Sequence, residues 1–391
     1  YDPQTNPHAP TLRAWRMISE PSEQSMVAVR NPYYYRVDAA GNQLPYIDAV
    51  ETQLESRPSV ILLKMASGNV DFQVREIAFE HFRYLKAHES QGDYEIRLWA
   101  NDYCGEVTFS PLQPHRDPQY ARLQETPAFR HALSLAINRR EIIDVVYGGI
   151  GTPAQFCVPE GSPYYCREHA EISVRFDPDR ANAMLDDLGL DRRRADGIRL
   201  LWDGSPLIMN VETEEVRPLA VVQMVCDYWR AIGIDTRMQV RSYALLNRLS
   251  ELGELDIRVH KEGGNFFGPI IPTGYAPAHP AEAVHWYGWA NYIFSGGRGG
   301  DIPPDRIMDI QRMWEEVIMA PSQEEKYAAW QRLSRRTAED LPIMAVMTSP
   351  GKLVYVRNNF RNVPRLALAG WAAHDPGNAC PEAFYFDPPQ E

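Results

Sequence analysis

Residues 261–304 combine side chains that could bind a small molecule, in a stretch rich in Gly, Pro and aromatic residues. An irregular segment this long inside a compact domain is usually functional. It follows a predicted strand, Leu255–His260, and open α/β sheets bind ligands at the carboxyl ends of their strands. Flat rings could form apolar walls, and neighbouring polar groups could donate or accept hydrogen bonds. The candidates are Phe266, Trp286, Tyr287 and Trp289 as walls, and His260, Glu262 and Asn265 as polar contacts. The alternative is a surface loop that its aromatic residues pin to the domain.

A second group of polar residues, Glu212, Glu214 and Glu215, ends another predicted strand. Paired carboxylates can act as general acid and base, so a hydrolase is one interpretation. A solvated loop is the other, and Glu212 is also a candidate ligand contact. The sequence contains no G-x-S-x-G, H-E-x-x-H, P-loop or dinucleotide-binding pattern, so it gives an enzyme no positive support. We expect no cofactor and no metal.

Composition excludes several classes of function. A chain of 391 residues is long enough for two or three domains. Its net charge of -12 disfavours a nucleic-acid partner, which needs a basic surface. No apolar run approaches the roughly 18 residues that a membrane span needs. We therefore expect contact with a membrane only through a partner, and a monomeric protein.

Two cysteines enclose a short loop that is rich in Pro and Gly. Cys157 and Cys166 could close this loop with a disulfide in an oxidising compartment. The alternative is a pair of free thiols. Cys226 lies in an apolar helical pattern and is expected to be a buried thiol.

The elements that would position these residues centre on residues 126–151. Thr126 and Pro127 predict the start of one helix, and Asn138, with Glu141 three residues later, predicts the start of a second. Strand-like and helical patterns then alternate. The expected strands are 198–204, 207–213, 234–240 and 255–260, and the expected helices 177–188, 216–232, 305–319 and 322–340. This alternation predicts a mainly parallel sheet with helices on both faces.

Several motifs resemble those of one protein family. Phe129–Arg139 resembles the signature of the extracellular solute-binding proteins of family 5, which serve ABC importers. The resemblance extends in order from about Trp15 to Phe386. The further motifs that carry it are Val29–Tyr34, Gly41–Asp48, Ala66–Asp71, Asn358–Pro364 and Pro376–Phe386.

The resemblance implies an α/β fold like that of the type II periplasmic binding proteins, with one complete lobe and part of the other. Residues 1–103 and 357–391 would form partial lobe I, and residues 104–356 lobe II. The N-terminal part of lobe I and a small extra domain of the family have no counterpart here. This would make the chain the C-terminal portion of a longer protein.

The function implied is solute capture between two lobes and delivery to a membrane ABC permease, in the periplasm or another extracytoplasmic space, without catalysis. Oligopeptides are the commonest substrates, and nickel, opines and sugars also occur. Peptide-binding members carry an Asp in the loop after the strand 255–260, where this chain has Glu262 but no clear Asp. The alternatives are a secreted hydrolase that uses the paired carboxylates and a partner that reports a solute to a receptor.

Overall fold

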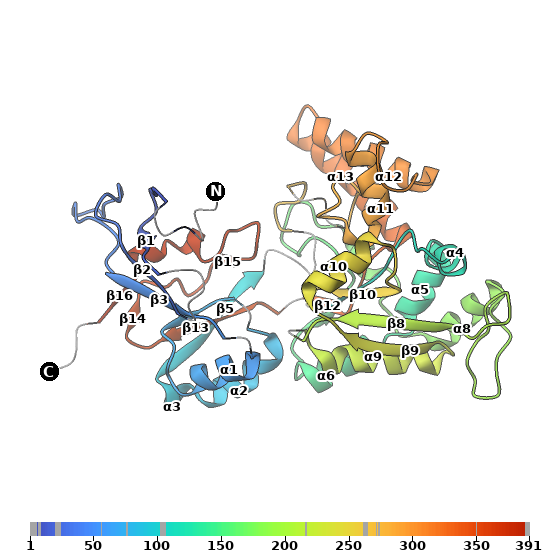
Figure 1. Ribbon diagram of the computed structural model, residues 1–391, viewed down its shortest axis with the longest axis horizontal. Coiled ribbons are helices and arrows are strands. Elements are labelled where there is room, and N and C mark those ends of the chain that lie inside the picture. Colours follow the sequence, from blue (N-terminus) through green and yellow to red (C-terminus); the bar gives the residue numbers. More distant parts are fainter. Residues whose placement is uncertain are drawn as a thin grey trace. The chain divides into compact units, whose positions relative to one another are not determined.

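The protein divides into two compact units in the computed structural model (Figure 1). Unit 1 comprises Tyr1–Ala100 and Gly351–Glu391, and unit 2 comprises Asn101–Pro350. The structure describes residues 6, 9–19, 25–55, 57–75, 77–101, 107–215, 217–260, 265–270, 272, 274–348 and 350–387. Within these residues, no helix is both long and apolar enough to cross a bilayer.

Unit 1 is built on two sheets, in which β2 runs antiparallel to β1 and β3, and β13 runs antiparallel to β4 and β5. The first has the order β1-β2-β3 and the second the order β15-β5-β13-β4. A short pair, β14 with β16, forms a separate two-stranded sheet, and Phe360 of β14 packs against Phe72 of β4. The strands are β1 (Trp15–Met17), β2 (Ser25–Arg30), β3 (Ala49–Gln53), β4 (Phe72–Gln73), β5 (Tyr94–Asn101), β13 (Lys352–Arg357), β14 (Phe360–Arg361), β15 (Leu368–Ala369) and β16 (Tyr385–Phe386). The helices are α1 (Pro58–Ala66), α2 (Phe82–Ala87) and α3 (Glu89–Gly92).

The return of the chain to unit 1 begins earlier than the sequence predicted. β13 pairs with β5 along its whole length, from Lys352 opposite Trp99 to Arg357 opposite Tyr94. Because these backbone hydrogen bonds belong to the unit 1 sheet, β13 is part of unit 1. The predicted boundary after residue 356 placed it in the other lobe.

A five-stranded sheet with the order β11-β6-β10-β8-β9 forms the centre of unit 2. β10 is parallel to β8, and β8 is parallel to β9. β6 runs antiparallel to β10 and to β11. The strands are β6 (Thr108–Pro111), β8 (Ile208–Thr213), β9 (Asp235–Val240), β10 (Ile257–His260) and β11 (Met344–Ala345); β7 (Thr152–Pro153) and β12 (Met347–Thr348) form a separate pair. Only β6 runs against the direction of the other four strands, and this sheet confirms the predicted type of fold.

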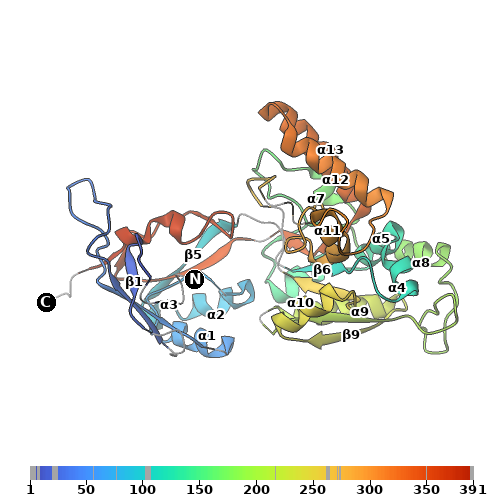
Figure 2. The same ribbon diagram turned by 45° about the horizontal axis from the view of Figure 1, so that its top comes forward.

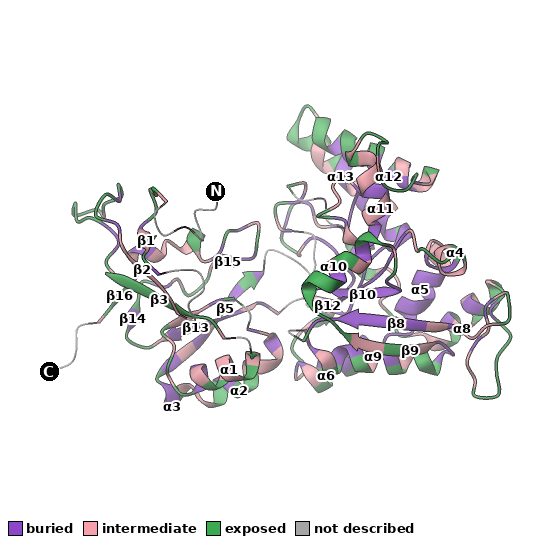
Figure 3. Ribbon diagram, viewed as in Figure 1, coloured by how far each residue is buried: buried purple, intermediate pink, exposed green. Residues whose placement is uncertain are grey.

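Helices cover both faces of this sheet, as the alternating pattern predicted (Figure 1). α9 packs against β8 and β9 on one side, while Leu246 of α10 packs against Leu112 and Leu255 on the other. α12 and α13 form an extended pair, visible side by side in Figures 1 and 2. The helices are α4 (Pro118–Gln124), α5 (Pro127–Leu135), α6 (Arg139–Val146), α7 (Arg167–Glu171), α8 (Pro178–Asp187), α9 (Leu219–Ala231), α10 (Tyr243–Glu251), α11 (Tyr287–Phe294), α12 (Asp305–Met319) and α13 (Gln323–Asp340). Figure 3 shows β8 mostly buried, and all four residues of β10 are buried.

The predicted helix pair at 126–151 is present as α5 and α6. Asn138 caps α6, because its side-chain oxygen accepts a hydrogen bond from Glu141 N (3.3 Å). Its Nδ2 also donates to Glu141 Oε2 (3.0 Å), so the two side chains bond to each other rather than Glu141 to the Asn138 backbone. Thr126 occupies the N-cap position of α5 but makes no capping bond; its hydroxyl donates to Arg122 O (2.7 Å).

One local expectation was wrong, and one open alternative is decided. Residues 198–204 form no strand; Arg199 and Leu200 make only isolated bridges, to Arg193 and Pro206. Cys157 and Cys166 are both buried, no disulfide joins them, and the Cys166 thiol donates to Glu168 Oε2 (3.4 Å). A short span of sequence between two cysteines was therefore not sufficient to predict a disulfide.

Candidate functional site

The carboxyl ends of the parallel strands β8, β9 and β10 share one edge of the unit 2 sheet. Glu212 lies near the end of β8, and His260 is the last residue of β10. β6 begins at the same edge, since Thr108 pairs with His260 and its hydroxyl donates to the His260 carbonyl (3.2 Å). Two of the predicted contact residues are therefore on one edge, which we call the carboxyl edge.

The acidic groups at the carboxyl edge are held by arginines. Glu212 Oε2 lies 2.9 Å from Arg241 Nε, and only 7% of the Glu212 side chain is exposed. Glu214 Oε2 lies 3.0 Å from Arg217 Nη2. Glu215 is exposed. Neither arginine was predicted as part of the site, although Arg241 directly follows the predicted strand 234–240 and so falls on the same edge.

His260 is a buried neutral group. Burial lowers the pKa of its imidazole well below the ordinary range, and the charges of Arg258 and Arg217 lower it further. A neutral imidazole offers one donor and one acceptor. The carboxyl edge thus presents ion-paired and neutral hydrogen-bonding groups, which suit binding to polar atoms of a ligand.

The loop after β10 is shaped by its own polar side chains. Asn265 Oδ1 accepts from Phe267 N (3.0 Å), and Asn265 Nδ2 donates to Gly268 O (3.1 Å). The Phe266 carbonyl accepts from Ser162 Oγ (2.6 Å), and the Phe266 and Phe267 rings meet edge to face. Asn265 therefore holds a turn. Glu262 lies outside the described residues.

The predicted aromatic walls lie elsewhere in unit 2. Trp286 and Trp289 are 0% and 2% exposed, and pack into the core with Trp314 and Trp330. Their segment lies beside the loop that follows β6, because Gln113 N donates to His285 O (2.7 Å). The structure thus favours the alternative interpretation for both tryptophans, as residues that pin the irregular segment to the core. Tyr287 is half-buried and lines a separate pocket.

The predicted site residues therefore do not lie together, and Asn265 and Phe266 belong to a turn that Ser162 contacts. Glu212 and His260 share the carboxyl edge. Trp286, Tyr287 and Trp289 lie in a segment beside the loop that follows β6, at the opposite edge of the sheet. Periodicity could not separate them, since the long irregular segment crosses from one edge of the sheet to the other. Within the described residues, no cluster of three or more His, Cys, Asp or Glu side chains could hold a metal ion.

The fold defines an α/β protein of two units whose larger unit carries a polar carboxyl edge. The sequence pattern of the bacterial extracellular solute-binding proteins, family 5, matches residues 4–274. That match covers more than half of the chain, and the chain therefore belongs to this family.

Solved structures and sequence relatives agree with this membership. An oligopeptide-binding protein, OppA, superimposes with a TM-score of 0.69 at 28% identity, covering 99% of this chain and 64% of its own. MelB from Agrobacterium fabrum, in complex with stachyose, gives 0.77 at 17% identity, covering 96% and 57%. The periplasmic alpha-galactoside-binding protein of Rhizobium meliloti is 20% identical over 378 residues, 91% of this chain and 52% of the relative.

A protein of Deinococcus radiodurans described as a probable ABC transporter-binding protein is 23% identical over 268 residues, which are 65% of this chain and 43% of the relative. The chain thus spans about half the length of these two sequence relatives.

Proposed function

We propose that the chain captures a small polar solute outside the cytoplasm and passes it, chemically unchanged, to the permease of an ABC importer. The observation that carries this proposal is the family match over residues 4–274. In this proposal unit 2 is one ligand-binding lobe, and unit 1 is part of the other lobe. The carboxyl edge of unit 2 would supply polar contacts, which fix a ligand's orientation in such sites. In this proposal the protein acts as a monomer and not as an enzyme.

The first candidate solute is an oligopeptide, the ligand for which the related OppA is named. An oligosaccharide is the second candidate. The relatives named for stachyose and alpha-galactosides suggest it, and so does the charge at the carboxyl edge. Glu212 and Glu214 are both paired with arginines, so neither is available to bind a peptide amine. A neutral solute would instead form hydrogen bonds with these paired groups.

Isothermal titration calorimetry with a tetrapeptide and with stachyose tests the proposal. One of the two solutes should bind with a stoichiometry of one, and chromatography of the mixture afterwards should recover it intact. Cleavage of the peptide or the saccharide would instead support the hydrolase interpretation. A protein that binds neither solute would contradict both candidate classes.

Replacing Glu212 with Gln should lower the affinity for the solute that binds by about tenfold or more, because a charge-assisted hydrogen bond is lost and Arg241 is left without its partner. Glu254→Gln is the matched control. Glu254 pairs with Arg116 beside the opposite end of β10, and its replacement should leave affinity unchanged. Circular dichroism should show both variants folded. If the two variants bind the solute with equal affinity, Glu212 does not contribute to solute binding.

A further inference from the structure

The junction between β9 and α10 presents exposed apolar side chains at the carboxyl edge. Val240, Tyr243 and Leu245 are 48%, 62% and 42% exposed, and Figure 3 shows the start of α10 as exposed. Val240, the last residue of β9, pairs with Thr213 at the end of β8, and Arg241 N donates to Thr213 O (2.8 Å). These bonds place the junction at the carboxyl edge. Exposed apolar side chains that lie next to polar groups are typical of ligand-binding surfaces.

One face of the Tyr243 ring lies against a buried arginine. The Arg258 guanidinium lies over the ring, 5.8 Å from its centroid, and attracts it electrostatically. Arg258 is 1% exposed, and it donates to the same helix, from Nη1 to Ser250 Oγ (2.9 Å) and from Nη2 to Asn247 Oδ1 (2.6 Å). The guanidinium is therefore fixed, and it covers one face of the ring. The exposure of Tyr243 leaves the other face open to solvent.

The Tyr243 ring is not part of the core of unit 2. Leu246 is the residue of α10 that packs against Leu112 and Leu255. Among the residues that the structure describes, the Tyr243 hydroxyl makes no hydrogen bond. A tyrosine ring has few rotatable bonds, so it offers a large contact area and loses little conformational entropy when a ligand covers it. The ring is therefore available to a ligand.

An ion pair borders this ring along the chain. Arg241 Nε lies 2.9 Å from Glu212 Oε2, and 39% of the Arg241 side chain is exposed. A guanidinium and a carboxylate each have more hydrogen-bonding sites than this one contact uses. A hydroxyl group both donates and accepts, so it can bind both members of the pair without separating them. A charged amine or carboxylate would have to compete with the pair, which favours a neutral ligand that is rich in hydroxyl groups.

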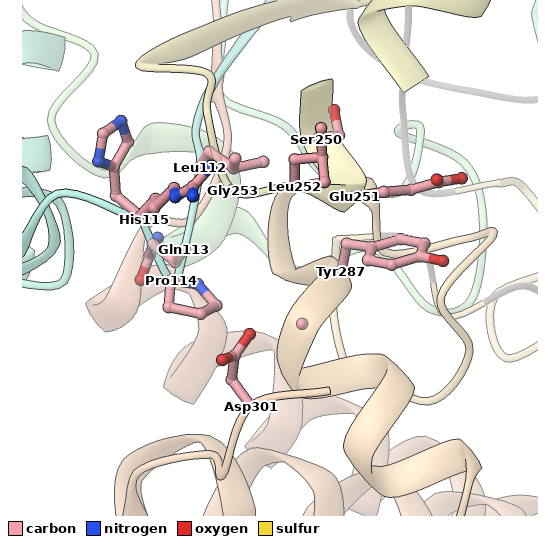
Figure 4. Close-up of a pocket in the computed structure, with 12 residues that line it drawn as sticks. Leu112, Gln113, Pro114, His115, Ser250, Glu251, Leu252, Gly253, Tyr287 and Asp301 are labelled. Atoms are coloured by element: carbon pink, nitrogen blue, oxygen red, sulfur yellow. The ribbon is translucent and has the colours of Figure 1, made fainter. Parts of the chain in front are cut away.

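Tyr287, one of the predicted aromatic walls, lies elsewhere. It lines a pocket of about 300 Å³ together with Glu251, Asp301 and the loop after β6 (Figure 4). Pro111, the last residue of β6, pairs with Ile257, the first residue of β10. The pocket therefore lies at the edge of the sheet opposite His260, and Tyr287 does not border the carboxyl edge.

We propose that Tyr243 stacks against one pyranose ring of an oligosaccharide, whose hydroxyl groups bind the Arg241–Glu212 pair. A pyranose ring has C–H groups on its face and hydroxyl groups around its rim, so it matches an aromatic face that polar groups border. This inference rests on the proposed function, and it names the saccharide, rather than the peptide, as the solute.

Titration calorimetry of the full chain with stachyose tests the role of Tyr243. The wild type should bind one equivalent, and Tyr243→Ala should weaken binding by about tenfold or more, because the apolar face is lost. Tyr243→Phe keeps the ring and should restore the affinity lost in Tyr243→Ala. Phe294→Ala is the matched control and should bind as the wild type does. Phe294 is 61% exposed and ends α11, whose first residue lines the pocket at the opposite edge.

Proton NMR of stachyose separates stacking from an indirect effect of the substitution. Protons above an aromatic face are shielded, so C–H signals of the sugar should move upfield on binding to the wild type and to Tyr243→Phe, but not to Tyr243→Ala. If Tyr243→Ala binds stachyose as the wild type does, the inference is overturned and the proposed function stands. Binding of a tetrapeptide in place of stachyose would have the same two consequences. Binding of neither solute would contradict both.

Discussion

Replacing Asp340 with Asn should lower the free energy of unfolding by about 3–5 kcal/mol, the cost of leaving buried charges without their partner. Asp340 ends α13, and its side chain is completely buried. Its two oxygens lie 3.1 Å from Arg130 Nη2 and 2.7 Å from Arg306 Nη1. Burial lowers the pKa of Arg130 to about 10, so the guanidinium stays charged at neutral pH and requires a counter-ion. An asparagine side chain carries no negative charge to balance the guanidinium groups of Arg130 and Arg306. Urea unfolding monitored by circular dichroism measures the loss.

The matched control for this experiment is Asp309→Asn. Asp309 pairs with Arg312 on the surface of α12, where both side chains are more than half exposed. Exposed pairs contribute about 0–1 kcal/mol, so this variant should unfold close to the wild type. A loss below about 1 kcal/mol for Asp340→Asn would show that the buried ion triad does not hold α13 to α5.

Replacing Arg139 with Lys should cost about 3 kcal/mol. Arg139 is buried, and its donors go to oxygen atoms that carry no net charge. Nε donates to Ala345 O (2.9 Å), Nη1 to Ser134 O (2.8 Å) and Nη2 to Ser134 Oγ (2.7 Å). Burial lowers its pKa to about 9. A lysine ammonium is a point donor and cannot reproduce the planar fork, so at least one buried carbonyl would lose its partner.

The neighbouring residue provides the control. Arg140 is exposed on the same helix, α6, and Arg140→Lys should change the unfolding free energy by less than about 0.5 kcal/mol. The comparison isolates the buried hydrogen bonds from any general effect of the substitution on helix α6. If the two variants unfold at the same denaturant concentration, the hydrogen bonds of the Arg139 guanidinium do not stabilise the packing of α5, α6 and β11.

Helices whose apolar residues recur at regular spacing could be predicted from the sequence. Apolar spacing located α9, α12 and α13, and the predicted cap at Asn138 is present. It could not predict that residues 198–204 form no strand, since pairing depends on neighbours far along the chain. It also did not identify the roles of Arg130 and Arg139. Both sit inside the recognised motif, but their partners, such as Asp340 and Ala345, lie about 200 residues away.

The candidate site was predicted less well for a related reason. The shared position of Glu212 and His260 could be predicted, because the carboxyl ends of parallel strands lie at one edge of a sheet. Trp286 and Trp289 were chosen for ring size, and large aromatic rings serve cores as readily as binding surfaces. Arg241 and Arg217 matter because they pair with predicted carboxylates, which only the folded arrangement shows.

Native mass spectrometry of the intact protein, purified from its own cells without denaturation, tests most directly whether this chain binds a solute without transforming it. We expect a single adduct of one small molecule per chain, released on denaturation as an intact polar solute. Protein that converts a supplied peptide or glycoside to products, with no bound species at any solute concentration, would contradict it.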